Sequence, residues 1–178
     1  MSTSFLYHAY NIVGYKHLHT KYAGNEINFS IKRDRWLKCP KCKSKDVILK
    51  GNKGRKIRGI PVFHKQIFFE FETVRVECKK CGGVNWVDTG ISEPWARHTK
   101  QFERYALELL KYATIQDVAK HLGVGWDTIK DIQKEYLIKK YKKPKLKGIE
   151  IIAIDEISIG SGHKYLTPIF TEVKSARV

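Results

Sequence analysis

The sequence predicts an α+β fold: a β domain organised around cysteines, then a helical domain, then a short β-hairpin. Three observations lead to this prediction. All four cysteines of the 178-residue chain lie in two C-x-x-C pairs, at residues 39–42 and 78–81, with strand-like segments between them. After Pro94 the apolar residues recur at helical spacing. From residue 149 an isoleucine-rich run predicts a buried strand.

The charge balance indicates a polyanionic partner. Lysine and arginine number 34 against 18 aspartate and glutamate residues, a net charge of +16. Because this charge is clustered rather than spread, it favours nucleic acid over a merely solvated basic surface. The sequence has neither a signal-peptide pattern nor an apolar stretch of about 20 residues. We therefore expect no membrane partner and a cytoplasmic location, associated with the nucleoid of a prokaryote.

Residues 1–37 are expected to form an N-terminal β segment. Within it Ile27, Phe29 and Ile31 alternate with polar residues, which predicts a half-buried strand. Gly24-Asn25 supplies the turn before that strand.

The β domain proper, residues 38–93, contains further strand signals. A short apolar strand, VILK, covers residues 47–50, and the GNKG that follows at 51–54 is interpreted as a hairpin turn. In QIFFEFETVRVEC (66–78) the apolar parity switches partway along. One face cannot bury both sets, so a bulge or break is expected near Thr73.

Each C-x-x-C pair forms a tight turn that directs two sulfur atoms toward one centre. Two pairs supply four thiolates, the closed tetrahedral set that structural Zn²⁺ prefers. The expected ligands are Cys39, Cys42, Cys78 and Cys81, and Gly82 lets the backbone fold back toward sulfur. Disulfides, a redox C-x-x-C pair and free thiols are the alternatives. Disulfides are rare in a reducing compartment, and neither pair opens a helix after a strand as a redox pair does.

Residues 94–138 are expected to form a helical domain. Thr99 and Thr114 are candidate N-caps, each followed by apolar residues at helical spacing. A last helix is expected from about Trp126 to Ile138.

The spacing within this domain predicts a helix-turn-helix. Ala119 would be the small residue where the two helices cross, Gly123 the turn residue with positive φ, and Ile129 a core residue of the second helix. An ordinary helical hairpin is the alternative interpretation.

Two sets of side chains are expected to contact double-stranded DNA. Outward-facing residues of the last helix would meet bases or phosphates: Gly125, Trp126, Asp127, Lys130, Asp131 and Lys134. Residues 38–65 hold eight lysines and two arginines against one acid, a net charge of +9, which favours contact with the phosphate backbone. The expected contacts there are Lys53, Arg55, Lys56 and Arg58.

A basic linker, residues 139–148, and an apolar segment, residues 149–178, complete the chain. The linker is expected to be extended and solvated, as a spacer or along a phosphate backbone. In the apolar segment a strand ends at Asp155, and a returning strand is expected over residues 165–170.

The motifs taken in order resemble insertion-sequence transposases of the ISL type. The resemblance covers the chain from about Asn11 and rests on CPxC, the strand RKIRGIP, CxxCG, the helix-turn-helix at 114–137 and IDEISIGSGHKYLT. It implies that the zinc-ribbon-like domain and the helix-turn-helix bind the terminal inverted repeats of the element. It also implies that residues 149–178 begin a ribonuclease-H-like domain, which in this family uses three carboxylates and divalent metal such as Mg²⁺.

By this resemblance Asp155 corresponds to the first catalytic carboxylate. After it the only acids are Glu156 and Glu172, so we expect a truncated transposase in which Asp155 is non-functional and Mg²⁺ has no complete site. A homodimer is one assembly compatible with this function.

Two other classes of protein share some of these features. A free-standing zinc and helix-turn-helix transcriptional regulator has no use for the strand IDEISIG. An RNA-binding zinc ribbon is disfavoured by the helix-turn-helix, because the A-form major groove is too narrow for a helix.

Overall fold

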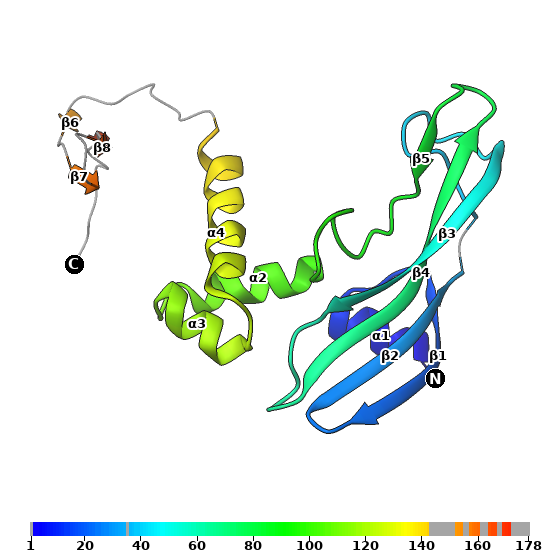
Figure 1. Ribbon diagram of the computed structural model, residues 1–178, viewed down its shortest axis with the longest axis horizontal. Coiled ribbons are helices and arrows are strands. Elements are labelled where there is room, and N and C mark those ends of the chain that lie inside the picture. Colours follow the sequence, from blue (N-terminus) through cyan, green and yellow to red (C-terminus); the bar gives the residue numbers. More distant parts are fainter. Residues whose placement is uncertain are drawn as a thin grey trace. The chain divides into compact units, whose positions relative to one another are not determined.

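The computed structural model describes residues 2–34 and 36–142, and further on the backbone of four short strands (Figure 1). The chain divides into two compact units, Met1–Glu135 and Tyr136–Val178. The first unit contains a helix, a five-stranded sheet and most of the helical domain, and the last helix continues into the second unit. The elements follow in the order α1 (Ser2–Tyr10), β1 (Tyr15–Ala23), β2 (Glu26–Arg33), β3 (Val47–Arg58), β4 (Gln66–Cys78), β5 (Val84–Trp86), α2 (Lys100–Leu109), α3 (Ile115–Leu122) and α4 (Trp126–Tyr141).

Strand β4 is the centre of the sheet, whose order is β1-β2-β4-β3. Along one edge β4 pairs antiparallel with β3 over almost its whole length. Along the other edge its first residues pair parallel with β2 and residues Arg75 to Glu77 pair antiparallel with β5. The predicted Gly24-Asn25 turn is confirmed, since Ala23 lies opposite Glu26 and Gly24 has φ +54°.

Helix α1 contributes buried side chains to the core of the sheet. The alternating sequence pattern did not predict this helix. Leu6 and Tyr10 are buried, and the Tyr10 ring meets the Phe69 ring edge-on with centroids 5.0 Å apart. Burying one such side chain contributes roughly 1.5–3 kcal/mol, which fixes a short helix that has weak intrinsic stability. The N-terminal segment is therefore α and β rather than β alone.

The predicted turn at GNKG is wrong, because β3 runs through it without a break. Gly51 has φ +138°, and the register between β3 and β4 shifts by one residue between Leu49 and Gly51. The predicted parity switch in β4 does occur, since Thr73 and then Val76 are buried. The extra residue of the bulge lies in β3, where glycine permits the unusual backbone, and β4 remains continuous.

The helical domain agrees with the predicted caps. The Thr99 hydroxyl accepts from the N–H of Phe102, and the Thr114 hydroxyl accepts from the N–H of Asp117. Gly123 ends α3 in the left-handed region with φ +61°, as expected for a C-cap glycine. The core of this domain consists of Phe102, Ala106, Val118, Ala119, Leu122, Ile129 and Ile132.

Helix α4 continues to Tyr141, so it takes up the first residues of the predicted extended linker. In the second unit β6 (Ile152–Ile154) pairs with β9 (Ile169–Thr171), and β7 (Ile157–Gly160) pairs with β8 (Lys164–Leu166), both antiparallel. The expected single hairpin is thus two strand pairs. Asp155, the predicted catalytic residue, lies outside the described residues.

Candidate metal centre and nucleic-acid interface

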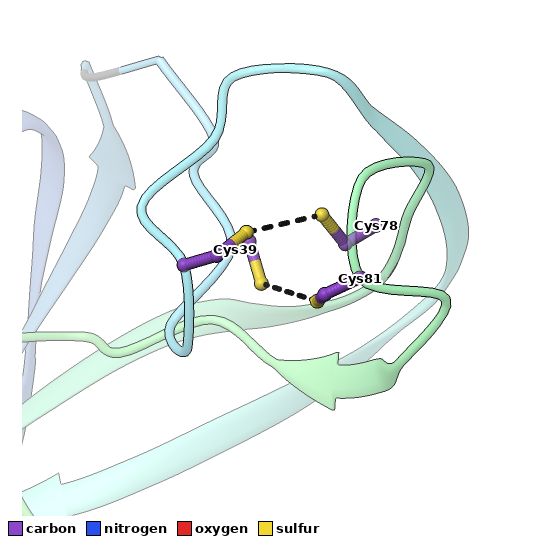
Figure 2. A group of neighbouring side chains, drawn as sticks. Cys39, Cys78 and Cys81 are labelled. Atoms are coloured by element: carbon purple, nitrogen blue, oxygen red, sulfur yellow. Dashed lines mark hydrogen bonds between the residues drawn. The ribbon is translucent and has the colours of Figure 1, made fainter.

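The four cysteines meet where β3 begins and β4 ends. This end of the strand pair is the one far from α1 (Figure 1). Cys39 and Cys42 come from the turn before β3, whereas Cys78 ends β4 and Cys81 follows it. The sulfur atoms face one another across a short gap (Figure 2), and all four lie within 4.8 Å of one another. The predicted cluster is therefore present, assembled from two segments that are distant in sequence.

The distances between the sulfurs fit a tetrahedral metal site. Four ligands at a Zn–S distance of about 2.3 Å would place neighbouring sulfurs about 3.8 Å apart. The Cys39 and Cys81 sulfurs are 3.7 Å apart, and the Cys42 and Cys78 sulfurs are 3.4 Å apart. A disulfide would require about 2.05 Å, and all four cysteines are free. The site can hold a zinc ion with little movement of the chain.

The backbone around the cluster favours thiolates. The N–H of Cys42 lowers the pKa of Cys39 to about 6, and the N–H of Cys81 lowers the pKa of Cys78. At Cys42 the N–H of Ser44 also lowers the pKa, but the neighbouring sulfurs and burial together raise it to about 11. Crowded sulfurs compete for negative charge, and a divalent cation would hold all four as thiolates.

Backbone hydrogen bonds close each cysteine turn, and one more joins the two segments. The N–H of Lys43 donates to the carbonyl of Cys39, and the N–H of Gly82 donates to the carbonyl of Cys78. Lys43 and Gly82 both have positive φ, 60° and 68°, which curls each turn around its sulfurs. The N–H of Lys79 donates to the carbonyl of Asp46, so a backbone hydrogen bond joins the two cysteine-bearing segments.

The helix-turn-helix presents the beginning of α4 to solvent. Ile129 and Ile132 face the helical core, which leaves the opposite side of α4 exposed. All six predicted contact residues lie on that exposed side or in the turn before it: Gly125, Trp126, Asp127, Lys130, Asp131 and Lys134. The Lys130 ammonium sits over the Trp126 ring, 4.7 Å from its centroid. The indole thus holds one cation of this face in place.

Of the four predicted cations of β3, the two lysines are exposed and the two arginines are half-buried or buried. Lys53 and Lys56 are exposed, and Lys56 forms an ion pair with Glu26 at 2.9 Å. Arg55 is half-buried and donates to the carbonyls of Glu93 and Ala96. Lys53 is therefore open to a phosphate, whereas Lys56 would have to exchange its contact with Glu26 for one.

Arg58 has a different environment from the one that the sequence predicted. Its side chain is 9% exposed, and it donates to the carbonyls of Leu122 and Gly123 and to Oε1 of Gln66. Burial lowers the pKa of its guanidinium, which nevertheless stays charged. Arg58 therefore joins the sheet to the turn of the helix-turn-helix rather than facing a phosphate. No local pattern marks this role, because Gln66 and Gly123 meet Arg58 only in the folded chain.

Known protein families match both the cysteine-containing segment and the helical domain. Residues 37–81 match a family model described as the zinc-finger of transposase IS204/IS1001/IS1096/IS1165. Residues 87–137 match the helix-turn-helix domain of transposase family ISL3. The transposase for insertion sequence element IS1001 of Bordetella parapertussis is 28% identical over 113 residues, which are 64% of this chain and 28% of that protein. No solved structure matches the chain.

The cysteine cluster and the helix-turn-helix are thus the two parts of the chain that are similar to DNA-binding domains of transposases. The two family models and the IS1001 relative together support an ISL3-type transposase N-terminal region for this chain. The match spans little more than a quarter of the IS1001 transposase. The comparisons do not favour the free-standing regulator. No helix in the described part of the chain is long and apolar enough to cross a membrane.

Proposed function

We propose that this chain binds double-stranded DNA at the terminal inverted repeats of an insertion sequence, with a structural zinc ion in its β domain. The observation that carries the proposal is the exposed face of α4, where Trp126, Asp127 and Lys130 lie on the first turns of the second helix of the helix-turn-helix. The N-terminal residues of such a helix contact base edges in the major groove. The net charge of +16 supplies the attraction to the duplex.

The two parts of the first unit have different tasks in this proposal. The beginning of α4 reads bases: the Lys130 ammonium donates to guanine, and Asp127 accepts from cytosine. Strand β3 lies toward the phosphate backbone, where Lys53 and Lys56 contribute affinity but no sequence preference. Lys134, one turn beyond Lys130, contacts phosphate as well.

Zinc has a structural role in the proposal. Four thiolates leave no position open for water or substrate, so the metal would perform no chemistry. It would instead fix Cys39 and Cys42 to the end of β4 and so keep β3, with its cations, in a fixed place. Ordering these side chains in advance reduces the entropy lost on binding.

A binding titration with matched variants tests the proposal. The affinity of the zinc-loaded chain is measured for element-end duplex and for a scrambled duplex at several salt concentrations. Lys130→Ala is expected to lower the ratio of the two affinities roughly 5–150-fold, since a base contact discriminates by about 1–3 kcal/mol. Lys21→Ala removes an exposed cation of β1 and should leave that ratio unchanged.

Equal affinity of the unaltered chain for both duplexes would refute recognition of the repeats. A homodimer on the paired repeats remains part of the proposal, and analytical ultracentrifugation of the chain with and without duplex tests it. A single copy per repeat and no larger complex would remove the dimer from the proposal.

A further inference from the structure

A hollow of about 650 Å³ lies beside the cysteine end of the sheet. On the sheet, the hollow is lined by Ile57 of β3, Thr73 of β4 and Trp86 of β5. Much of the rest of its wall comes from the segment 87–97. Its volume falls in the range of roughly 300–1,000 Å³ typical of small-ligand sites. Neither the base contacts of α4 nor the cysteine cluster uses it.

Hydrogen bonds hold the wall of this hollow firmly against β3. The Arg55 guanidinium donates to the carbonyls of Glu93 and Ala96. The N–H of Arg58 donates to the carbonyl of Arg97, and the N–H of Thr99 donates back to the carbonyl of Arg58, both at 2.8 Å. The hollow is therefore a built feature of the fold, since its wall is tied to the sheet at several points.

The side chains around the hollow combine flat aromatic surface with positive charge. Trp86 is 44% exposed and Trp95 is 74% exposed, and both line it. Lys53 and Arg97 line it too, and among the described residues neither side chain forms a hydrogen bond or an ion pair. Aromatic rings beside free cations are the elements of sites that bind unpaired nucleotides.

Two further polar groups shape the site. Ser92 is 3% exposed, and its hydroxyl has no partner among the described residues although it lines the hollow. Of the two acids in the lining, Glu93 pairs with Lys100 at 3.3 Å, whereas Asp88 accepts a hydrogen bond from the N–H of Gly90 and keeps its negative charge. The Glu93 charge is therefore offset, and the phosphate of a ligand would lie on the side of Arg97 rather than beside Asp88.

We propose that this hollow receives an unpaired nucleotide of a DNA strand that leaves the duplex bound by α4. The base stacks on Trp95, and the Arg97 guanidinium meets the adjoining phosphate. A nucleotide within the duplex cannot do this, because its faces are covered by its neighbours. The inference rests on the proposed binding of duplex DNA and adds to it a second site, specific for single-stranded extensions.

The test compares three DNA probes on the zinc-loaded chain: a blunt duplex, the same duplex with a four-thymidine tail, and the four-thymidine strand alone. Stacking of one base contributes roughly 1–3 kcal/mol, so the tail should strengthen binding about 5–150-fold. Trp95→Ala should abolish this gain while leaving the affinity for the blunt duplex unchanged. Trp36→Ala, which removes another exposed tryptophan at 85% exposure, should keep the gain.

The outcomes separate this inference from the proposed function. Equal affinity for blunt and tailed duplexes overturns the nucleotide site and leaves duplex binding intact. An equal loss on both probes in Trp95→Ala also overturns it, because the residue would then contact duplex. Binding of the tailed duplex and the single strand without binding of the blunt duplex would support the nucleotide site and refute the proposed duplex function. Zinc content and circular dichroism show whether each variant is folded. Both variants are expected to fold, because the rings that they remove are exposed.

Discussion

Replacing Arg58 by methionine would distinguish a structural role of this residue from a phosphate contact. The guanidinium donates to the carbonyls of Leu122 and Gly123 and to the Gln66 side chain. Hydrogen bonds from charged groups contribute about 1.5–3 kcal/mol, and an unpaired buried carbonyl costs about 1–3 kcal/mol. Part of this loss is offset, because methionine removes the cost of burying a charge.

The net expectation for Arg58→Met is a free energy of unfolding lower by about 2–3 kcal/mol. With a urea dependence of roughly 1–3 kcal/mol per molar, the unfolding midpoint should fall by about 1 M. Urea titration followed by tryptophan fluorescence, with zinc in excess, measures this shift. Affinity for every duplex should fall because the turn loses its support, while the salt dependence of binding stays the same.

Lys53→Met is the matched control, because it removes a cation from the same strand at an exposed position. It should change the unfolding free energy by less than about 0.5 kcal/mol. It should instead reduce the slope of log affinity against log salt by about 0.9, as expected for one lost phosphate contact. If Arg58→Met keeps its stability and reduces the salt slope, Arg58 contacts phosphate and the structural role is refuted.

Two further predictions concern the cysteine cluster and the helical turn. The purified chain should contain one zinc ion, and Cys78→Ser should lose it together with strand signal in circular dichroism; metal analysis giving no zinc in folded, reduced chain would contradict the assignment. Gly123→Ala should lower the unfolding free energy by about 1–2 kcal/mol, since φ is +61° and the new Cβ would lie 3.3 Å from Nε2 of Gln66. Gly54→Ala is its control, because no atom lies within 4 Å of a Cβ there and its φ is not in the left-handed region; equal losses in the two variants would refute the argument from backbone conformation.

The features that the sequence predicted correctly are those with short-range causes. Thr114 caps α3 through an N–H three residues away, and Gly123 ends the same helix through its own backbone angle. The cysteine cluster was also predictable, because the spacing within each pair fixes the direction of the sulfurs. Such features need no knowledge of the rest of the fold.

The features that the sequence did not predict depend on distant partners. Helix α1 forms because Leu6 and Tyr10 are buried against a sheet whose strands come later in the chain. Gly51 looked like a turn residue, but pairing with β4 kept it in a strand as a bulge. Arg58 was counted with the other cations of β3, since its pattern shows charge and not burial. In each case tertiary packing decided between local alternatives.

The position of β4 between β2 and β3 has a consequence for any shorter piece of this protein. Residues 67–71, IFFEF, form a stretch of high β propensity with a single charge, the composition typical of self-associating strands. In the folded chain β2 covers one edge of this stretch and β3 the other. A fragment limited to residues 37–81, the span of the zinc-finger match, would lack β2 and α1. Its uncovered edge and exposed phenylalanines would favour aggregation, so solubility in this protein depends on the N-terminal hairpin.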